Sequence, residues 1–358
     1  MRYRKVANSD VTVSEVGFGV WTVATSWWGE HTDEDAVSML REARDLGITF
    51  FDTADTYGNG RGETLLRDAF PGGERANVVI GTKFGYDWKS RPKEAVAGHQ
   101  EAPQNWDVSF IENSLNESLE RLGTDYIDTW QFHNPRMDAL EHDEVWHFLQ
   151  RMKQEGKIRS IGVALGPAIG WLDEGVYSMK ERGADVVQII YNALELDPGR
   201  GLIAAAEEAG TSLLVRVPHS SGMLEGKYTP DTVFPKSDHR SHRPKAWLVN
   251  GLKKVDQLSF LMQGEATIGQ AALQFLTQTP SIVSSLPNIY DRDQLHEFAA
   301  APDTPLVTSE QYDQVEKLFD ANFGLEVERE AGLASKSAPK NRTSDEIKGS
   351  DQVKAASR

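Results

Sequence analysis

Three stretches in a row carry the pattern that decides the fold: NVVIGTKF (77–84), SFIENSLNESLERLG (109–123) and YIDTWQFH (126–133). The first and third are short, largely apolar and rich in β-branched or aromatic residues, which predicts strands. The middle stretch has apolar residues at helical spacing and stops at a glycine. Apolar strands joined by a helix are typical of a parallel sheet that is buried on both faces.

The same strand–helix unit recurs along the chain. Further strands are predicted at residues 16–21, 49–54, 158–165, 184–192, 211–218 and 281–287, and further helices at 33–47, 143–156 and 267–278. Eight such units predict an α/β fold that closes into a (β/α)8 TIM barrel, although an open, doubly wound sheet would give the same count. Ahead of the first unit, RYRKVA (2–7) and VTVSEV (11–16) flank a polar turn, which predicts an N-terminal β-hairpin closing one barrel end.

The domain boundary is expected near the C-terminus. We expect the barrel to occupy residues 1–325 and residues 326–358 to form a polar, disordered tail, because 335–358 has no aromatic residue and no apolar pattern. The longest irregular connection, 225–251, follows the predicted seventh strand. Connections of that length in a compact domain usually have a function.

Charge and cysteine content narrow the class of protein. Of the 358 residues, 54 are acidic and 38 are basic, which gives a formal net charge of −16. Such a surface repels nucleic acid and anionic membranes. The absence of cysteine excludes a disulfide, a thiol nucleophile and a thiolate-bound metal. The sequence shows neither a secretory signal pattern nor a membrane span of roughly 18 apolar residues. We therefore expect a cytoplasmic protein that acts on a small molecule, and its oligomeric state stays open.

Polar residues stand at the ends of three consecutive predicted strands. Asp52 lies at the end of the second strand and Tyr57 follows five residues later, while Lys83 and His133 lie at the ends of the third and fourth strands. The C-terminal ends of barrel strands face the rim where barrel enzymes carry out their chemistry. We therefore expect a carboxylate, a phenol, an ammonium group and an imidazole to meet in one cleft.

These four groups suit the reduction of a carbonyl group. A proton must reach the carbonyl oxygen as hydride reaches the carbon, and a tyrosine hydroxyl, with an ordinary pKa of about 10, is a weak donor at neutral pH. A nearby ammonium group makes such a hydroxyl a stronger acid. A buried ammonium group needs a carboxylate to stay charged, and Lys83 and Asp52 can form that pair. A neutral imidazole at His133 could hold the carbonyl oxygen in position.

Seven segments, in this order, resemble the aldo-keto reductase family: SEVGFGVWT (14–22), FFDTADTYG (50–58), VVIGTKFG (78–85), RLGTDYIDTWQFH (121–133), GKIRSIGV (156–163), VVQIIYN (186–192) and GMLEGKY (222–228). The resemblance covers roughly residues 1–325. It implies the reversible, NAD(P)H-dependent reduction of an aldehyde or a ketone to an alcohol. It also implies Tyr57 as general acid, Lys83 and Asp52 as the pair that tunes it, and His133 as the group that orients the carbonyl.

The resemblance further implies an extended nicotinamide cofactor, with NADPH as the first expectation and NADH as the alternative. The positions that match the family's cofactor contacts are Gly19, Trp21, Gln188, Arg216, Pro218, Gly222, Leu224, Lys227, Asn288 and Gln294. Those that match its substrate contacts are Trp27 and Trp28. Ala164 and Leu165 stand where many members have Ser-Asn, so Gln188 has to hold the nicotinamide amide without their help. Arg216 replaces a stacking aromatic ring, and its planar guanidinium group can also stack on a flat ring.

The expected adenosine end departs from the family pattern. Tyr290 stands where many members have an arginine for the 2′-phosphate, and Phe298 stands where they have an asparagine for the adenine. Arg292 could take over the missing positive charge. So could Arg240 and Arg243, in the basic loop after the seventh strand, because arginine binds phosphate through paired hydrogen bonds.

Two other classes of function fit parts of the sequence. A barrel that binds the cofactor as a redox sensor, with slow turnover, would carry the same four polar residues. A metal-dependent barrel hydrolase could use His133, His219, Asp52 and His239, but the chain has no His-x-His pair at a strand end, the commonest form of such sites. The sequence therefore favours a reductase, with no metal site predicted.

Overall fold

A closed barrel of eight parallel strands forms the centre of the structure, a computed structural model that describes residues 1–90, 102–166, 171–236 and 238–326. The barrel strands are Phe18–Gly19 (β3), Phe50–Asp52 (β4), Val79–Phe84 (β5), Ile127–His133 (β6), Ile158–Ala164 (β7), Val186–Ile190 (β8), Ser212–Arg216 (β9) and Ile282–Leu286 (β10). Each strand pairs with its neighbour along the chain, and a parallel bridge between Val16 and Ser285 joins the first strand to the last. The predicted barrel is confirmed, and the doubly wound alternative is wrong because the sheet closes.

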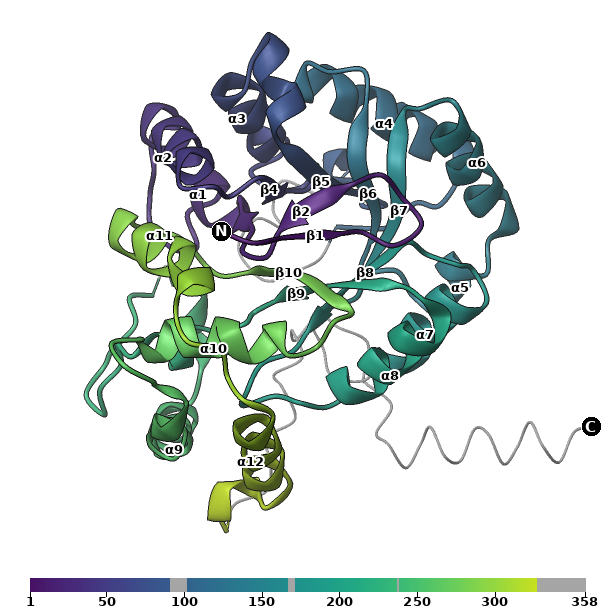
Figure 1. Cartoon of the computed structure of the whole chain (residues 1–358). Helices are drawn as coiled ribbons and strands as arrows, with labels where there is room; N and C mark the ends of the chain where they lie inside the picture. Colours follow the sequence, from purple (N-terminus) through teal and green to yellow (C-terminus); the bar gives the residue numbers. More distant parts are fainter. Residues whose placement is uncertain (91–101, 167–170, 237, 327–358) are drawn as a thin grey trace, which may run out of the picture.

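Helices surround this barrel, as Figure 1 shows. They are Trp21–Ala24 (α1), Asp33–Asp45 (α2), Arg61–Ala69 (α3), Val108–Leu122 (α4), Met137–Leu140 (α5), Asp143–Gln154 (α6), Leu172–Lys180 (α7), Gly199–Ala209 (α8), Lys245–Asp256 (α9), Ile268–Thr277 (α10), Arg292–Ala299 (α11) and Ser309–Asp320 (α12). Most follow a strand and bury one apolar stripe; α2, for example, buries Ala36, Met39, Leu40 and Ala43.

Capping residues explain where several helices begin and end. The Thr32 side chain accepts a hydrogen bond from the Asp35 amide at the start of α2, and Thr267 forms a reciprocal capping box with Gln270 at α10. Helix α4 ends at Gly123, which adopts the left-handed conformation with φ of 62°. The four predicted helices agree with the observed bounds to within two residues.

The predicted hairpin closes the N-terminal end of the barrel. Its strands, Tyr3–Lys5 (β1) and Thr12–Ser14 (β2), pair antiparallel and lie across the barrel in Figure 1. The apolar residues that fill this end are Val6, Val11 and Val13 of the hairpin with Phe50, Val186, Leu214, Val283 and Leu286 of the strands. The opposite end, where the strands terminate, is therefore the end available for chemistry.

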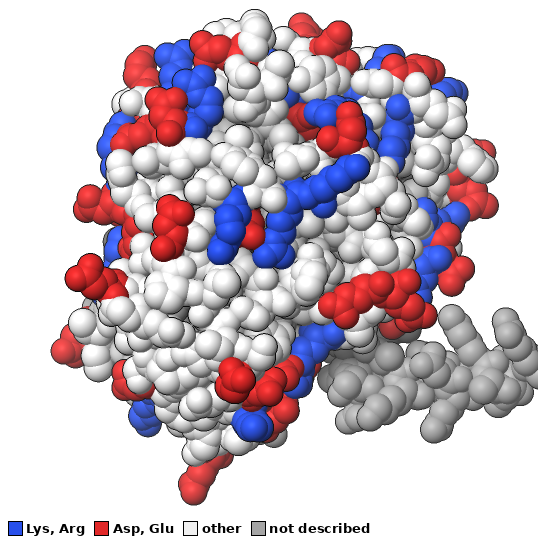
Figure 2. Space-filling model, in the orientation of Figure 1, with Lys and Arg blue, Asp and Glu red and all other residues white. Residues whose placement is uncertain are grey.

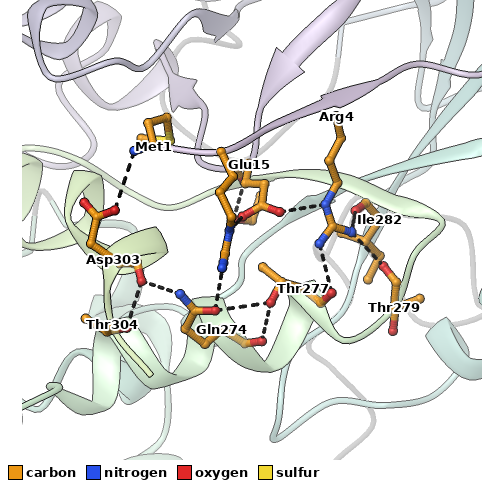
Figure 3. A network of polar contacts seen from close by, with 12 residues as sticks. Met1, Arg4, Glu15, Gln274, Thr277, Thr279, Ile282, Asp303 and Thr304 are labelled. Carbon is orange, nitrogen blue, oxygen red and sulfur yellow. Dashed lines mark hydrogen bonds and ion pairs between the residues drawn. The ribbon is translucent and has the colours of Figure 1, made fainter. Parts of the chain in front are cut away.

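A polar network ties the hairpin to the last β/α unit (Figure 3). The buried Glu15 carboxylate accepts hydrogen bonds from Arg2 Nε at 2.6 Å and from Arg4 Nε at 2.7 Å. Arg4 also donates to the carbonyl oxygens of Thr277 and Ile282, at 3.0 and 2.9 Å. Because these bonds join the first residues of the chain to α10 and β10, they hold the two ends of the barrel sequence together.

Two predicted segments differ from the structure. The strand expected at 16–21 is shorter, because the chain turns into α1 at Trp21 and the Thr22 hydroxyl fixes that turn by donating to the Ile289 carbonyl oxygen at 2.5 Å. The connection 225–251 is not irregular throughout: it contains a 3-10 helix at His239–His242 and the start of α9. The predicted tail, apart from Glu326, lies outside the described residues.

Acidic and basic side chains are interspersed on the face that carries the hairpin (Figure 2). The charge excess of the sequence therefore does not form a single negative field on this face. Within the described ranges, no helix is both long enough and apolar enough to cross a membrane.

Candidate active site

The side chains of Asp52, Lys83 and Tyr57 meet at the C-terminal rim of the barrel. Lys83 Nζ donates hydrogen bonds to Asp52 Oδ2 and to the Thr53 carbonyl oxygen, both at 2.6 Å, and to the Tyr57 hydroxyl at 3.3 Å. Asp52 ends β4, Lys83 lies on the adjacent β5, and Tyr57 lies on the turn after β4. Neighbouring parallel strands end on the same side of a sheet, which is why the three groups converge.

The ion pair is almost completely removed from solvent. Lys83 is fully buried and Asp52 is 4% exposed. Burial disfavours the ammonium form, but the negative charge of Asp52 and the contact with Tyr57 outweigh it, so the pKa of Lys83 is raised above its ordinary value. Asp52 Oδ1 also accepts hydrogen bonds from Gln131 Nε2 at 3.1 Å and from Gln188 Nε2 at 3.0 Å. These hydrogen bonds hold the pair in one geometry.

His133, the last residue of β6, lies next to Tyr57. Its ring centroid is 6.0 Å from that of Tyr57 and 4.9 Å from that of Tyr86, and both contacts are edge-on. Burial, with further contributions from the positive charges of Lys83 and Arg216, holds the pKa of His133 well below its ordinary value. His133 is therefore neutral at physiological pH. Within the described part of the chain, its Nδ1 atom has no hydrogen-bond partner.

Sequence reasoning missed two residues that shape this site. Gln131 is fully buried and bonded to Asp52, and Tyr86 packs on His133 while accepting a hydrogen bond from Asn134 Nδ2 at 2.9 Å. Gln131 precedes His133 by two residues, so the period-two alternation of a strand puts both on the same face. That spacing was a usable signal, whereas Tyr86 lies beyond the strand, where no periodicity applies.

Comparison with known proteins shows the family to which the chain belongs. The family model described as the aldo/keto reductase family matches residues 15–320. The chain belongs to the aldo/keto reductase family. It is thus an NAD(P)H-dependent oxidoreductase, and members of this family act on small-molecule carbonyl substrates.

Relatives of this aldo/keto reductase span most of its length. It is 27% identical to the NADH-specific methylglyoxal reductase of Escherichia coli, over 84% of this chain and 93% of that protein. It is 29% identical to the aldo-keto reductase yakc [NADP(+)] of Schizosaccharomyces pombe, over 79% of this chain and 82% of that protein. A solved structure, the glycerol dehydrogenase AKR11B4 from Gluconobacter oxydans, has the same fold, with a TM-score of 0.75, 23% identity, and coverage of 95% and 98% of the two chains.

Several expected cofactor positions in this reductase lie on β3, β8 and β9 or just after them. Gly19 on β3 lies opposite Asp52 in the register of β3 and β4. The buried Gln188 side chain donates a hydrogen bond to the Asp52 carboxylate, and Pro218, two residues after β9, is buried as well. The Arg216 guanidinium group donates to the Leu165 carbonyl oxygen at 2.5 Å. Gln188 and Arg216 thus both reach the rim, and each already makes a bond within the protein.

A second set lies in the segments after β9 and β10. Gly222 has φ of 90°, and a Cβ atom there would lie 2.2 Å from the Tyr228 hydroxyl, so the position requires glycine. Leu224 is fully buried, and exposed Lys227 lies 3.6 Å from Asp291 in an ion pair. The other two expected positions are the half-buried Asn288 and the fully buried Gln294.

The tryptophans after β3 form an aromatic cluster with the partly exposed Trp21. Trp27 lies 6.5 Å from Trp21, ring centroid to ring centroid, and remains partly exposed. Trp28 is 7% exposed because its ring stacks on Tyr290 at 5.3 Å, and the Arg240 guanidinium group lies over it at 4.3 Å. Trp28 therefore joins segments that are far apart in the sequence, whereas Trp27 is less buried than Trp28.

The arginines expected to bind phosphate are engaged within the protein. Arg240 is 8% exposed and forms an ion pair with Asp238 at 2.5 Å. Arg243 Nη2 donates to Ser221 Oγ at 3.3 Å. Arg292 is exposed and pairs with Asp35 and Glu42 of α2, at 2.9 and 3.1 Å. The Arg292 guanidinium group thus already pairs with two carboxylates of α2.

The hydrolase alternative would need His133, His219, Asp52 and His239, and the side chain of His239 lies outside the described part of the structure. Among the described residues, no group of three His, Asp or Glu side chains could hold a metal ion. His219 packs its ring 4.5 Å from Phe298 and lies within hydrogen-bond distance, 3.0 Å, of the Gly269 carbonyl oxygen.

Proposed function

We propose that this reductase converts an aldehyde or a ketone to an alcohol, reversibly, with Tyr57 as the proton donor. The observation that carries the proposal is the position of Lys83 Nζ, which lies 2.6 Å from Asp52 and 3.3 Å from the Tyr57 hydroxyl. A buried ammonium group is costly unless it is paired. Here the pair also puts the positive charge of Lys83 beside the Tyr57 hydroxyl. That charge stabilises the phenolate that forms when Tyr57 gives up its proton.

Each of the four groups then has a separate role. Tyr57 gives its hydroxyl proton to the carbonyl oxygen, and Lys83 stabilises the phenolate that remains. Asp52 keeps Lys83 charged. His133, held neutral by its surroundings, donates a ring N–H to the carbonyl oxygen and orients it, without competing as the acid. A positioned acid of this kind contributes about 10²- to 10⁴-fold in rate.

The segment after β9 fits a nicotinamide dinucleotide. Ser220, Ser221 and Gly222 are buried and have φ values of 48°, 56° and 90°, a run of left-handed residues that is strained for serine. Such a run aligns backbone N–H groups in a way that suits an anion such as a pyrophosphate. When bound, the nicotinamide ring supplies the hydride. The residues that would hold the dinucleotide are Gly19, Trp21, Gln188, Arg216, Pro218, Gly222, Leu224, Lys227, Asn288 and Gln294.

The substrate would be held beside Tyr57 and His133, with Trp27 as the proposed aromatic contact. The relatives do not decide the cofactor, since one is named for NADH and another for NADP(+). The family resemblance implies NADPH first, with NADH as the alternative. The preference between the two cofactors depends on the groups that surround the adenosine ribose.

Cofactor oxidation with a panel of small aldehydes and ketones tests the proposal. We expect turnover by the wild type and a loss of 100-fold or more in kcat for Tyr57→Phe, with the dinucleotide Kd unchanged. Tyr3→Phe is the matched control, because Tyr3 is 50% exposed on the hairpin, at the opposite end of the barrel. Dinucleotide binding without turnover on any carbonyl compound would instead favour a redox-sensing protein.

A further inference from the structure

Glu225 is a buried carboxylate between the segments that follow the seventh and eighth barrel strands. It is 5% exposed and closes the 3-10 helix Met223–Glu225. Its Oε2 atom accepts hydrogen bonds from the Tyr290 hydroxyl at 3.1 Å and from Gln294 Nε2 at 2.8 Å. Its Oε1 atom has no hydrogen-bond partner in the described part of the chain. One acceptor atom is therefore left for a donor from outside the protein.

The nearby positive charges do not neutralise Glu225. Lys227 pairs with Asp291 at 3.6 Å, and Arg240 pairs with Asp238 at 2.5 Å. Among the described residues, no lysine or arginine forms an ion pair with Glu225. Burial raises the pKa of Glu225 to about 7, although the Tyr290 hydroxyl, Arg240 and Lys227 act in the opposite direction. The carboxylate is thus a buried negative charge without an ion-pair partner among the described residues above neutral pH.

The place of this carboxylate suggests what it meets. In barrel enzymes, the loops after strands seven and eight commonly hold the phosphate groups of a ligand. Glu225 lies three residues beyond the strained turn at Gly222 and donates its own amide to the Gly222 carbonyl oxygen at 3.1 Å. A dinucleotide with its pyrophosphate at that turn would bring a ribose close to the carboxylate.

We propose that Glu225 makes this reductase select NADH over NADPH. This inference rests on the proposed function. The free Oε1 atom accepts a hydrogen bond from the ribose 2′-hydroxyl, as acidic residues do at other NAD sites. A 2′-phosphate at the same position would face a buried carboxylate, and the two negative charges would repel each other. Tyr290 reinforces the preference for NADH. It donates a hydroxyl hydrogen bond to Glu225 at the position where the family resemblance expects an arginine for the 2′-phosphate.

Equilibrium titration of the full-length protein with NADH and NADPH tests this selection. The titrations are done at pH 8, where Glu225 is ionised, and are followed by cofactor fluorescence. A hydrogen bond to a charged group typically changes affinity by roughly 10- to 100-fold. We therefore expect the wild type to bind NADH at least 10-fold more tightly than NADPH. Glu225→Gln should reduce that ratio by at least 10-fold, by weakening NADH and strengthening NADPH.

Two further variants complete the test. Asp293→Asn is the matched control, because it removes a negative charge that is exposed on the first turn of α11, and it should change the ratio less than threefold. Tyr290→Arg adds a positive charge beside Glu225 and should strengthen NADPH binding, which keeps the proposal testable if Glu225→Gln does not fold. Equal or tighter binding of NADPH by the wild type, or an unchanged ratio in Glu225→Gln, would overturn the selection while leaving the reductase proposal intact. Failure of the wild type to bind either dinucleotide would overturn both.

Discussion

Replacing Lys83 by methionine should destabilise the folded chain, and the size of the loss should depend on Asp52. Removing one member of a buried ion pair leaves the other charge unpaired, at a cost of about 3–5 kcal/mol. In Lys83→Met, Asp52 keeps two neutral donors, the side-chain amides of Gln131 and Gln188, at 3.1 and 3.0 Å. These amides offset part of the loss. We therefore expect the free energy of unfolding to fall by about 3 kcal/mol, the lower end of that range.

Urea unfolding at pH 8 measures this loss for Lys83→Met, Asp52→Asn and the double variant. The double variant removes both charges and should recover most of the stability, because it leaves no buried charge without a partner. At pH 5, Lys83→Met should be less destabilised than at pH 8. A buried carboxyl group without its cation binds a proton at a higher pH than it does in the unfolded chain, so the stability of the variant rises as the pH falls.

A loss below about 1 kcal/mol for Lys83→Met at pH 8 would mean that Lys83 and Asp52 do not form a buried ion pair, because breaking such a pair costs several times that amount. A double variant whose loss equals the sum of the two single losses would contradict the pair as well. Additive losses would mean that Lys83 and Asp52 do not stabilise each other.

Three other outcomes are expected. Arg216→Ala should weaken dinucleotide binding by about 1–2 kcal/mol in a titration, since a desolvated guanidinium group over a flat ring contributes about that much; an unchanged Kd would remove Arg216 from the cofactor site. Arg240→Ala should make the loop 235–245 more sensitive to subtilisin, because Arg240 is buried against Trp28 and bonded to Asp238, and equal cleavage rates would show that these contacts do not hold the loop in place. The folded-state pKa of His219 is lowered by burial to about 4, so below about pH 6.5 the unfolded chain binds more protons and stability should fall by about 1.4 kcal/mol per pH unit as far as pH 4. His219→Gln should flatten that slope in urea unfolding between pH 7 and 5, and an unaltered slope would show that His219 is not its source.

The barrel and the rim could be read from the sequence because both depend on local patterns. Each predicted strand is a short apolar run, and each of the four predicted helices has apolar residues at helical spacing. Asp52, Lys83 and His133 stand at strand ends, so parallel pairing alone brings them together. Gln131 could also have been found, since it shares a strand face with His133.

The adenosine end could not be read in the same way. Glu225 and Tyr290 lie in connections, where no period relates one side chain to another, and the hydrogen bonds of Glu225 to Tyr290 and to Gln294 of α11 join residues up to 69 positions apart. The contacts of the arginines in the basic loop could not be predicted from the sequence either. The structure pairs Arg240 with Asp238 and stacks it on Trp28, contacts that depend on how distant segments pack.

Single-turnover transfer of a label tests the central claim, that Tyr57 protonates a carbonyl oxygen as hydride reaches the carbon. The protein is saturated with a reduced nicotinamide cofactor that carries two deuterium atoms at C4 and is then mixed with 4-nitrobenzaldehyde, and the deuterium in the alcohol is followed by mass spectrometry. We predict transfer to the carbonyl carbon in the wild type, and a rate slower by about 100-fold or more in Tyr57→Phe at the same cofactor saturation. Labelled alcohol formed by Tyr57→Phe at more than a tenth of the wild-type rate, or an alcohol without label from the wild type, would contradict the account.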